Sequence, residues 1–112
     1  MTNPVVAVLA ALPEEGDAFF PGAGERDARG WLPLRTVRAG GMTCIVATHG
    51  IGKVHAAAAT MALAERFTPR LFLGIGTAGK IGRAAGDCFW LESAVQHDYG
   101  AEHPDGFVHY TA

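Results

Sequence analysis

The fold that this sequence predicts is decided by the stretch Arg70-Leu-Phe-Leu-Gly-Ile-Gly-Thr-Ala-Gly79. Its first part, Arg70–Leu73, is a short apolar run typical of a strand buried on both faces. Gly76 and Gly79 then lie on either side of Thr77, and glycines let a backbone turn sharply and direct its N–H groups towards a ligand. Ligands of open α/β sheets bind at the carboxyl ends of the strands. We therefore predict a ligand-binding loop here.

The composition describes a globular chain and excludes several classes of protein. With 112 residues, 49% of them hydrophobic and 18% charged, the chain is long enough for one domain and is not disordered. A net charge of −2 without a basic patch argues against a nucleic-acid partner. No apolar run approaches the ~20 residues of a membrane span, and no basic region precedes the first apolar run, as a signal peptide would require. We expect a cytoplasmic protein with neither nucleic-acid nor membrane partners.

Hydrophobic periodicity predicts five strands and two helices. The predicted strands are apolar or alternating runs at Val5–Ala11, Trp31–Arg38, Met42–Thr48, Arg70–Leu73 and Cys88–Val95. A short helix is predicted to start at Pro13 and to end by Phe20, and a long one to cover Lys53–Phe67. The residues expected to pack this long helix on the sheet are apolar at helical spacing: Val54, Ala57, Ala58, Met61, Ala62 and Leu63. Beyond Gln96 the chain is polar, and we predict irregular structure.

Cysteines and histidines indicate neither a disulfide nor a metal site. Cys44 and Cys88 each lie within an apolar run, which is typical of a buried free thiol. The five histidines have no metal-ligand spacing, so we predict no bound metal.

The number of helices is small for the predicted sheet. A mostly parallel sheet needs helices on both faces, and one long and one short helix cannot cover both. We therefore expect residues 1–112 to form a single incomplete domain, apparently truncated, that is completed by further chain or by a partner.

Two glycine motifs resemble nucleotide-binding loops but lack their context. The spacing Gly74-x-Gly76-x-x-Gly79 matches the dinucleotide fingerprint, yet the next residues, Lys80–Gly86, are a poor helix. His49–Lys53 lacks the first glycine and the hydroxyl residue of a P-loop, although its glycine turn still feeds a helix N-terminus. An anion- or sugar-binding loop is therefore favoured over a dinucleotide site.

Polar or glycine-rich segments follow four predicted strands, at Glu15, Gly50–Gly52, Gly74–Thr77 and His97–Asp98. Glu15 is the candidate to orient or deprotonate a water, whereas the neighbouring Glu14 is explained by its place in the first turn of a helix. His97 is a candidate base, ligand contact or interface residue. We predict that these segments meet at one edge of the sheet.

The order of these motifs resembles the purine nucleoside phosphorylase/uridine phosphorylase superfamily. The resemblance rests on four segments: Val5–Glu15, Thr48-His-Gly-Ile-Gly-Lys-Val54, Gly74-Ile-Gly-Thr-Ala-Gly79 and Gly86-Asp87 with the predicted strand after it. It is closest to 5′-methylthioadenosine/S-adenosylhomocysteine nucleosidases and covers the N-terminal half of that family's domain. The resemblance implies an α/β fold, with a mostly parallel or mixed sheet and flanking helices.

The resemblance also implies roles for individual residues. Glu15 matches the residue that holds the attacking water in the nucleosidases. Thr77 matches a Ser or Thr that contacts this water, or phosphate in the phosphorylases. Ile51 matches an apolar contact to the 5′-substituent, and Ala11 and Leu12 line the same site.

Further matches concern the glycine loop and the partner. Gly76 and Gly79 are expected to contact substrate, and His97 and Asp98 match a region at a dimer interface that contributes to the neighbour's pocket. A homodimer, or association with a complementary half, is therefore expected. Lys80 departs from the usual glycine. The ribose-binding glutamate segment and the aspartate that protonates the purine have no match in the chain.

The resulting functional prediction is hydrolysis of the N-glycosidic bond of a purine (thio)nucleoside such as methylthioadenosine or S-adenosylhomocysteine. One alternative is phosphorolysis, with inorganic phosphate as co-substrate and no other cofactor. A second alternative is a catalytically incomplete fragment that acts only in binding or assembly.

Overall fold

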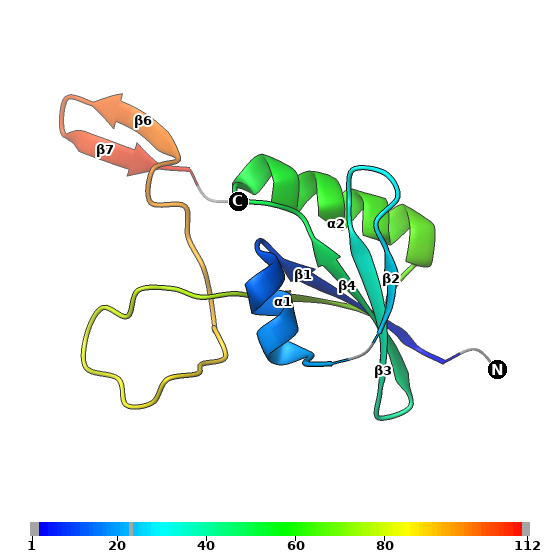
Figure 1. Cartoon of the computed structure of the whole chain (residues 1–112). Helices are drawn as coiled ribbons and strands as arrows, with labels where there is room; N and C mark the ends of the chain where they lie inside the picture. Colours follow the sequence, from blue (N-terminus) through cyan, green and yellow to red (C-terminus); the bar gives the residue numbers. More distant parts are fainter. Residues whose placement is uncertain (1–2, 23, 111–112) are drawn as a thin grey trace. The chain divides into compact units, whose positions relative to one another are not determined.

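The computed structural model describes residues 3–22 and 24–110 of the chain (Figure 1). Its internal contacts divide the chain into two compact units, Met1–Gly79 and Lys80–Ala112.

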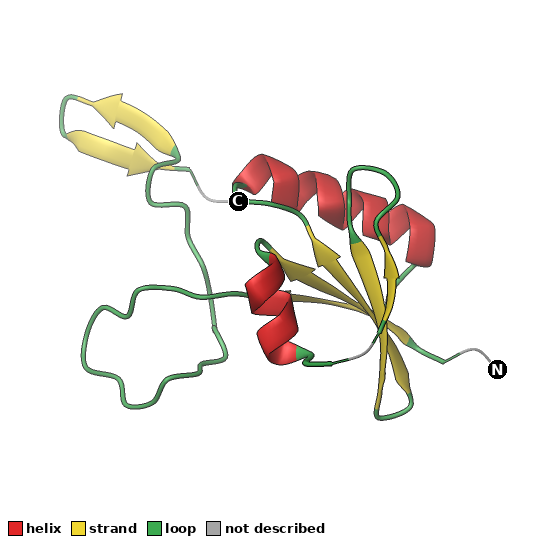
Figure 2. Ribbon diagram, in the orientation of Figure 1, coloured by secondary structure: helices red, strands yellow, loops and turns green. Residues whose placement is uncertain are grey.

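The first unit is a five-stranded mixed sheet with two helices (Figure 2). Its elements in chain order are β1 (Val5–Ala10), α1 (Pro13–Phe19), β2 (Glu25–Asp27), β3 (Leu34–Ala39), β4 (Met42–Thr48), α2 (Lys53–Phe67) and β5 (Leu71–Ile75). The strand order is β2-β3-β4-β1-β5, in which β1 pairs in parallel with β4 and β5, and β3 pairs antiparallel with β2 and β4. The predicted α/β class with a mixed sheet and flanking helices is confirmed.

Alternation along the central strands separates two layers of core. Ala7, Ile45 and Ala47 face α2, where they pack with Ala59 and Leu63. The residues of the opposite face, which α1 covers, are Val6, Val8, Cys44 and Val46, with Phe20 and Leu73 against them. Because side chains of a strand point to opposite faces in turn, a single strand such as β1 serves both layers.

Two predicted boundaries of the first unit follow local chemistry. Gly40 and Gly41 have positive φ values of 55° and 76°, as the tight turn that joins β3 and β4 into an antiparallel hairpin requires. Thr68 ends α2 in the left-handed conformation, directly before Pro69. The short strand β2 was not predicted, because three polar residues show no strand pattern.

The predicted packing face of α2 was partly wrong. Ala59 and Leu63 are its buried residues, whereas Val54 and Met61 are 80% and 58% exposed. The helix has apolar residues on more than one side, so periodicity alone cannot select the face. The small Ala59 side chain, next to the equally small Ala7, permits the close approach of helix to sheet.

In the second unit, the predicted strand Cys88–Val95 is wrong. No helix or strand is found between residues 76 and 99, and Trp90, Leu91 and Val95 are each at least 80% exposed. A strand needs a partner for its backbone hydrogen bonds, and this segment pairs with none in the described part of the chain. For the same reason Cys88 is exposed, although Cys44 is buried as predicted; both thiols are free.

The second unit instead forms a hairpin where irregular structure was predicted. Its strands are β6 (Gly100–His103) and β7 (Gly106–His109), joined through Pro104 and Asp105. Tyr99 and Tyr110 flank the hairpin, with their rings edge to face at a centroid distance of 5.2 Å.

Among the described residues, no helix has the length and apolar character needed to cross a membrane.

Candidate active site

Glu15 and Thr77 lie in direct contact at the carboxyl edge of the sheet. Oε2 of Glu15 accepts a hydrogen bond of 2.6 Å from the Thr77 backbone N–H and a second one of 3.0 Å from the Thr77 hydroxyl. Thr77 follows β5, and Glu15 lies in the first turn of α1, after the neighbouring strand β1. The sequence prediction that these two residues meet is therefore confirmed, whereas their chemical roles stay predictions.

The start of α1 holds Glu15 in place. Pro13 occupies the first helical position, where its missing N–H is no loss. Oε1 of Glu15 accepts a 3.1 Å hydrogen bond from the Leu12 backbone N–H, so the side chain also caps its own helix. The Glu15 carboxylate is thus fixed at both oxygens.

These donors lower the pKa of Glu15. The main cause is the hydrogen bond from the Thr77 backbone N–H, followed by that from the Thr77 hydroxyl; the Leu12 N–H and the nearby His49 ring add to the effect. Hydrogen bonds to the charged form favour ionisation, so Glu15 is a carboxylate at neutral pH. A carboxylate has about four acceptor positions, and three are occupied by these donors. The remaining position can accept a hydrogen bond from water.

Gly76 makes the close approach of Glu15 possible. A Cβ at this position would lie 3.1 Å from Glu15 Oε2, which is tighter than ordinary van der Waals contact. Gly79, by contrast, has no atom near its Cβ position. The glycine loop therefore has one position with a defined steric role, Gly76, and the predicted substrate contacts of both glycines stay predictions.

The loop between β4 and α2 reaches the same edge. The backbone N–H groups of His49 and Gly50 donate to the carbonyls of Ala10 and Ala11, at 2.9 and 3.0 Å. These bonds place Ala10 and Ala11 beside His49 and Gly50. Ile51, the next residue, has 74% of its surface exposed. Ala11 and Ile51 thus belong to loops that hydrogen bonds join, as the predicted site requires.

His49 contributes to the electrostatics of the site, which the sequence interpretation missed. Its Nδ1 lies 2.7 Å from the Gly50 carbonyl oxygen. A carbonyl oxygen only accepts hydrogen bonds, so Nδ1 carries the proton in this contact. The signal in the sequence that could have identified His49 is its place directly after the predicted strand Met42–Thr48.

His97 and Asp98 lie in the second unit, where no strand precedes them. The prediction that they end a strand is wrong, because the segment before them is a loop. The His97 carbonyl accepts a 2.7 Å hydrogen bond from His109 Nε2 and so joins the loop to β7. Their proposed place at an interface stays a prediction. The described residues contain no cluster of His, Cys, Asp or Glu that could hold a metal ion.

Comparison with known proteins places this geometry in a family. A model of the phosphorylase superfamily matches residues 5–111. No match to the chain was found among curated proteins.

Solved structures agree with this family. The 5′-methylthioadenosine/S-adenosylhomocysteine nucleosidase of Helicobacter pylori is 26% identical, with a TM-score of 0.62 over 70% of this chain and 35% of that one. The futalosine hydrolase of the same organism is also 26% identical, with a TM-score of 0.60 over 68% of this chain and 34% of that one.

A further structure of the Helicobacter pylori nucleosidase supports the fold alone, at 23% identity. It has a TM-score of 0.70 over 100% of this chain and 52% of that one. The chain thus spans about a third to a half of the length of these relatives.

The chain belongs to the phosphorylase superfamily, which is a family of enzymes. The solved structures that it resembles are a nucleosidase and a futalosine hydrolase.

Proposed function

We propose that the protein hydrolyses the N-glycosidic bond of a purine (thio)nucleoside, with Glu15 orienting the attacking water. The observation that carries the proposal is the ionised Glu15 carboxylate, held by Thr77 with one acceptor position left. In this reaction the water oxygen bonds to C1′ of the ribose while the bond from C1′ to the base nitrogen breaks. The electron pair of that bond goes to the base, which takes up a proton, and the water loses one.

Phosphorolysis is the second candidate, because Thr77 and the glycine loop offer N–H and O–H donors to an anion. The Glu15 charge argues against it. Both donors of Thr77 already point at a carboxylate, and a phosphate placed there would be repelled by that charge at short range. Water has no such penalty. Neither route needs a cofactor, and inorganic phosphate would be a co-substrate only for phosphorolysis.

The proposed substrates are methylthioadenosine and S-adenosylhomocysteine, with futalosine as the competitor. Both kinds of relative are 26% identical to the chain, which does not separate them. Ile51 and Leu12 are exposed apolar side chains at the loops beside Glu15 and suit an apolar 5′-substituent. This favours methylthioadenosine, whose 5′-methylthio group is apolar.

The test is release of free base by the protein as its gene encodes it. Methylthioadenosine, S-adenosylhomocysteine, futalosine, adenosine and inosine are compared with and without phosphate, and the sugar product is identified as free or phosphorylated. Glu15→Gln should reduce turnover by roughly 10²-fold or more, as removal of an acid–base group does. Glu14→Gln is the matched control, because Glu14 is the exposed neighbour on the same helix. Equal activity of the two variants would contradict the proposal. Binding of nucleoside without any turnover would also contradict it, and it is the result expected of a fragment that acts only in binding or assembly.

We further propose that the protein is a homodimer. Val54 and Met61 expose apolar surface along α2, and Leu71 and Phe72 do so on β5, one of the two edge strands of the described sheet. Exposed apolar patches of this kind usually mark a contact surface. Val54→Glu with Met61→Glu should lower the mass measured by sedimentation from dimer to monomer. An unchanged mass would favour cover by another part of the same protein.

A further inference from the structure

Arg35 is the only buried charged residue among those that the structure describes, with 4% of its surface exposed. It lies on β3 opposite Val46 of β4, which in turn neighbours Val8 of β1. Val46 and Val8 belong to the layer beneath α1. A charge is costly to bury unless it is paired and hydrogen-bonded, so an arginine in this apolar row needs a specific role.

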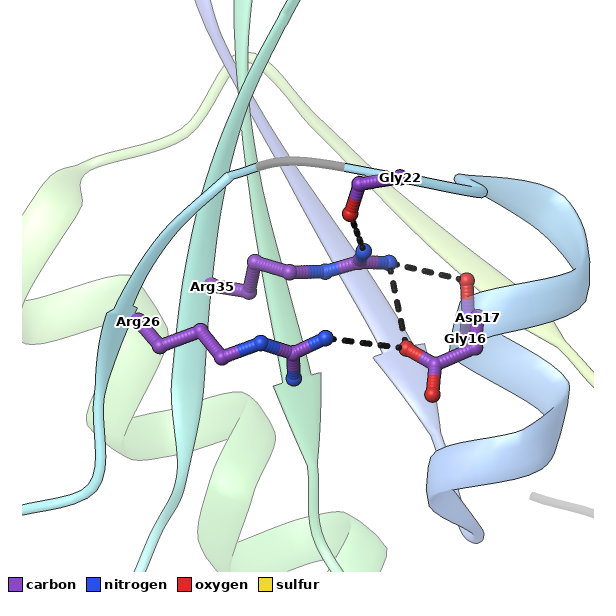
Figure 3. Close-up of polar contacts among 5 residues, drawn as sticks. All are labelled: Gly16, Asp17, Gly22, Arg26 and Arg35. Carbon is purple, nitrogen blue, oxygen red and sulfur yellow. Dashed lines mark hydrogen bonds and ion pairs between the residues drawn. The ribbon is translucent and has the colours of Figure 1, made fainter.

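The guanidinium of Arg35 reaches from β3 to α1 and to the loop after it (Figure 3). Nη2 donates a 3.0 Å hydrogen bond to the Gly16 carbonyl and lies 3.7 Å from Asp17 Oδ1. Nη1 donates to the Gly22 carbonyl at 3.3 Å. Arg26 of β2 approaches the same Asp17 oxygen at 3.4 Å, but this second arginine is largely exposed.

Glycines allow the chain to lie close to this arginine. A Cβ at Gly24 would come within 2.9 Å of Arg35 Cγ, and a Cβ at Gly16 within 3.4 Å of Val46. Side chains at these positions would push the loop and the helix away from the sheet. The hydrogen bond from Arg35 to the Gly16 carbonyl thus forms at close range, and Gly16 is the residue directly after Glu15.

α1 has only seven residues, too few for a helix to be stable by itself. Its position must therefore come from ties to the sheet. Glu15 ties one side of α1 to Thr77 after β5, and Arg35 ties Gly16 to β3. These two strands lie on opposite sides of the central pair β4 and β1, so α1 is held across the sheet from both directions.

We propose that Arg35 is a positioning residue, which fixes α1 through the Gly16 carbonyl and so sets the place of the Glu15 carboxylate against Thr77. Its consequence for turnover rests on the proposed function, whereas its consequence for the geometry of Glu15 does not. The planar fork of arginine suits this role, because it reaches Gly16 and Gly22 at once. A lysine carries the charge without the fork.

The test compares Arg35→Met and Arg35→Lys with Arg38→Met in the protein as its gene encodes it. Arg38 is the matched control, because it lies on the same strand with an exposed side chain. Thermal unfolding first establishes which variants fold. The Glu15 carboxyl is then titrated by carbon NMR with labelled glutamate, its signal assigned by Glu15→Gln, and the Thr77 amide is followed with labelled threonine.

In Arg35→Met, we expect the Glu15 pKa to rise towards its ordinary value and the Thr77 amide signal to shift. We expect kcat to fall by about tenfold or more with KM changed by less than about threefold, which is the signature of lost positioning. Arg35→Lys should lie between Arg35→Met and the parent, and Arg38→Met should match the parent. If Arg35→Met does not fold, Arg35→Lys decides.

Folded Arg35 variants with an unchanged Glu15 titration and Thr77 amide would overturn the inference, even if their stability fell. Failure of the proposed function has a different signature, since Glu15→Gln would then turn over nucleosides like the parent. In that case the two NMR measurements still decide whether Arg35 places Glu15.

Discussion

The Thr77 backbone N–H lies 2.6 Å from Glu15 Oε2, although 62 positions separate the two residues in the sequence. This bond joins the ends of β5 and β1 through a helix turn and a glycine loop. It connects the two segments that carry the proposed chemistry, and it makes the ionisation of Glu15 depend on the loop.

Thr77→Ala removes the hydroxyl donor and leaves the backbone donor in place. Since one hydrogen bond contributes modestly, we expect kcat/KM to fall by about 3- to 10-fold with the fold intact. Thr77→Ser keeps a hydroxyl and should retain most activity. A sharp loss of thermal stability with unchanged substrate binding would instead make Thr77 a structural residue.

Gly76→Ala should disturb Glu15 directly. The new methyl group would lie 3.1 Å from Oε2, so the carboxylate must move or its bond to Thr77 must lengthen. We expect a higher Glu15 pKa and a loss of turnover of about tenfold or more. Gly79→Ala is the control for the steric effect, because nothing lies near that Cβ position. Equal titration curves in both variants would contradict the prediction.

The pH dependence follows from the direction of the Glu15 shift. The pKa of Glu15 is lowered from 4.5, first by the Thr77 backbone N–H and then by its hydroxyl. A lowered pKa in the folded state means that the stabilising contribution of the carboxylate is present above pH 4.5 and is lost as the pH falls through the folded pKa. Because the pKa of Glu15 in the folded protein lies below 4.5, we expect kcat/KM to keep its Glu15-dependent part at pH 4.5 and to lose it only at lower pH.

In Thr77→Ala this acid limb should move to higher pH, because the hydroxyl no longer stabilises the charge. The shift is partial, since the backbone N–H remains. A limb that stays in place would show that the hydroxyl does not influence Glu15.

Ala59→Leu tests the corrected packing face of α2. Ala59 is fully buried against the sheet, and extra methylene groups in a packed core cost roughly 1–3 kcal/mol of unfolding free energy. Ala57→Leu makes the same change at an exposed position of the same helix and should be nearly neutral. Chemical denaturation measures both. A larger loss of unfolding free energy for Ala57→Leu than for Ala59→Leu would show that α2 packs through the face predicted from periodicity.

Local signals in the sequence were enough for much of the first unit. Apolar runs placed β1 and β4, and the bounds of α2 follow from its own residues and from Pro69. The contact between Glu15 and Thr77 was also predictable in kind, because carboxyl ends of neighbouring parallel strands meet at one edge. That the chain forms a single incomplete domain stays a prediction.

Tertiary structure alone decided the rest. Cys88–Val95 has the composition of a strand but pairs with no other strand among residues 3–22 and 24–110, and α2 has apolar side chains on more sides than the sheet can cover. Arg35 is the sharpest case. Its spacing of two residues from Val37 places both side chains on the same side of β3, yet only the approach of α1 shows that this side is buried and that Gly16 receives the Arg35 hydrogen bond. A sequence states which side chains a strand can present to each face; which of them become buried depends on the elements that pack there.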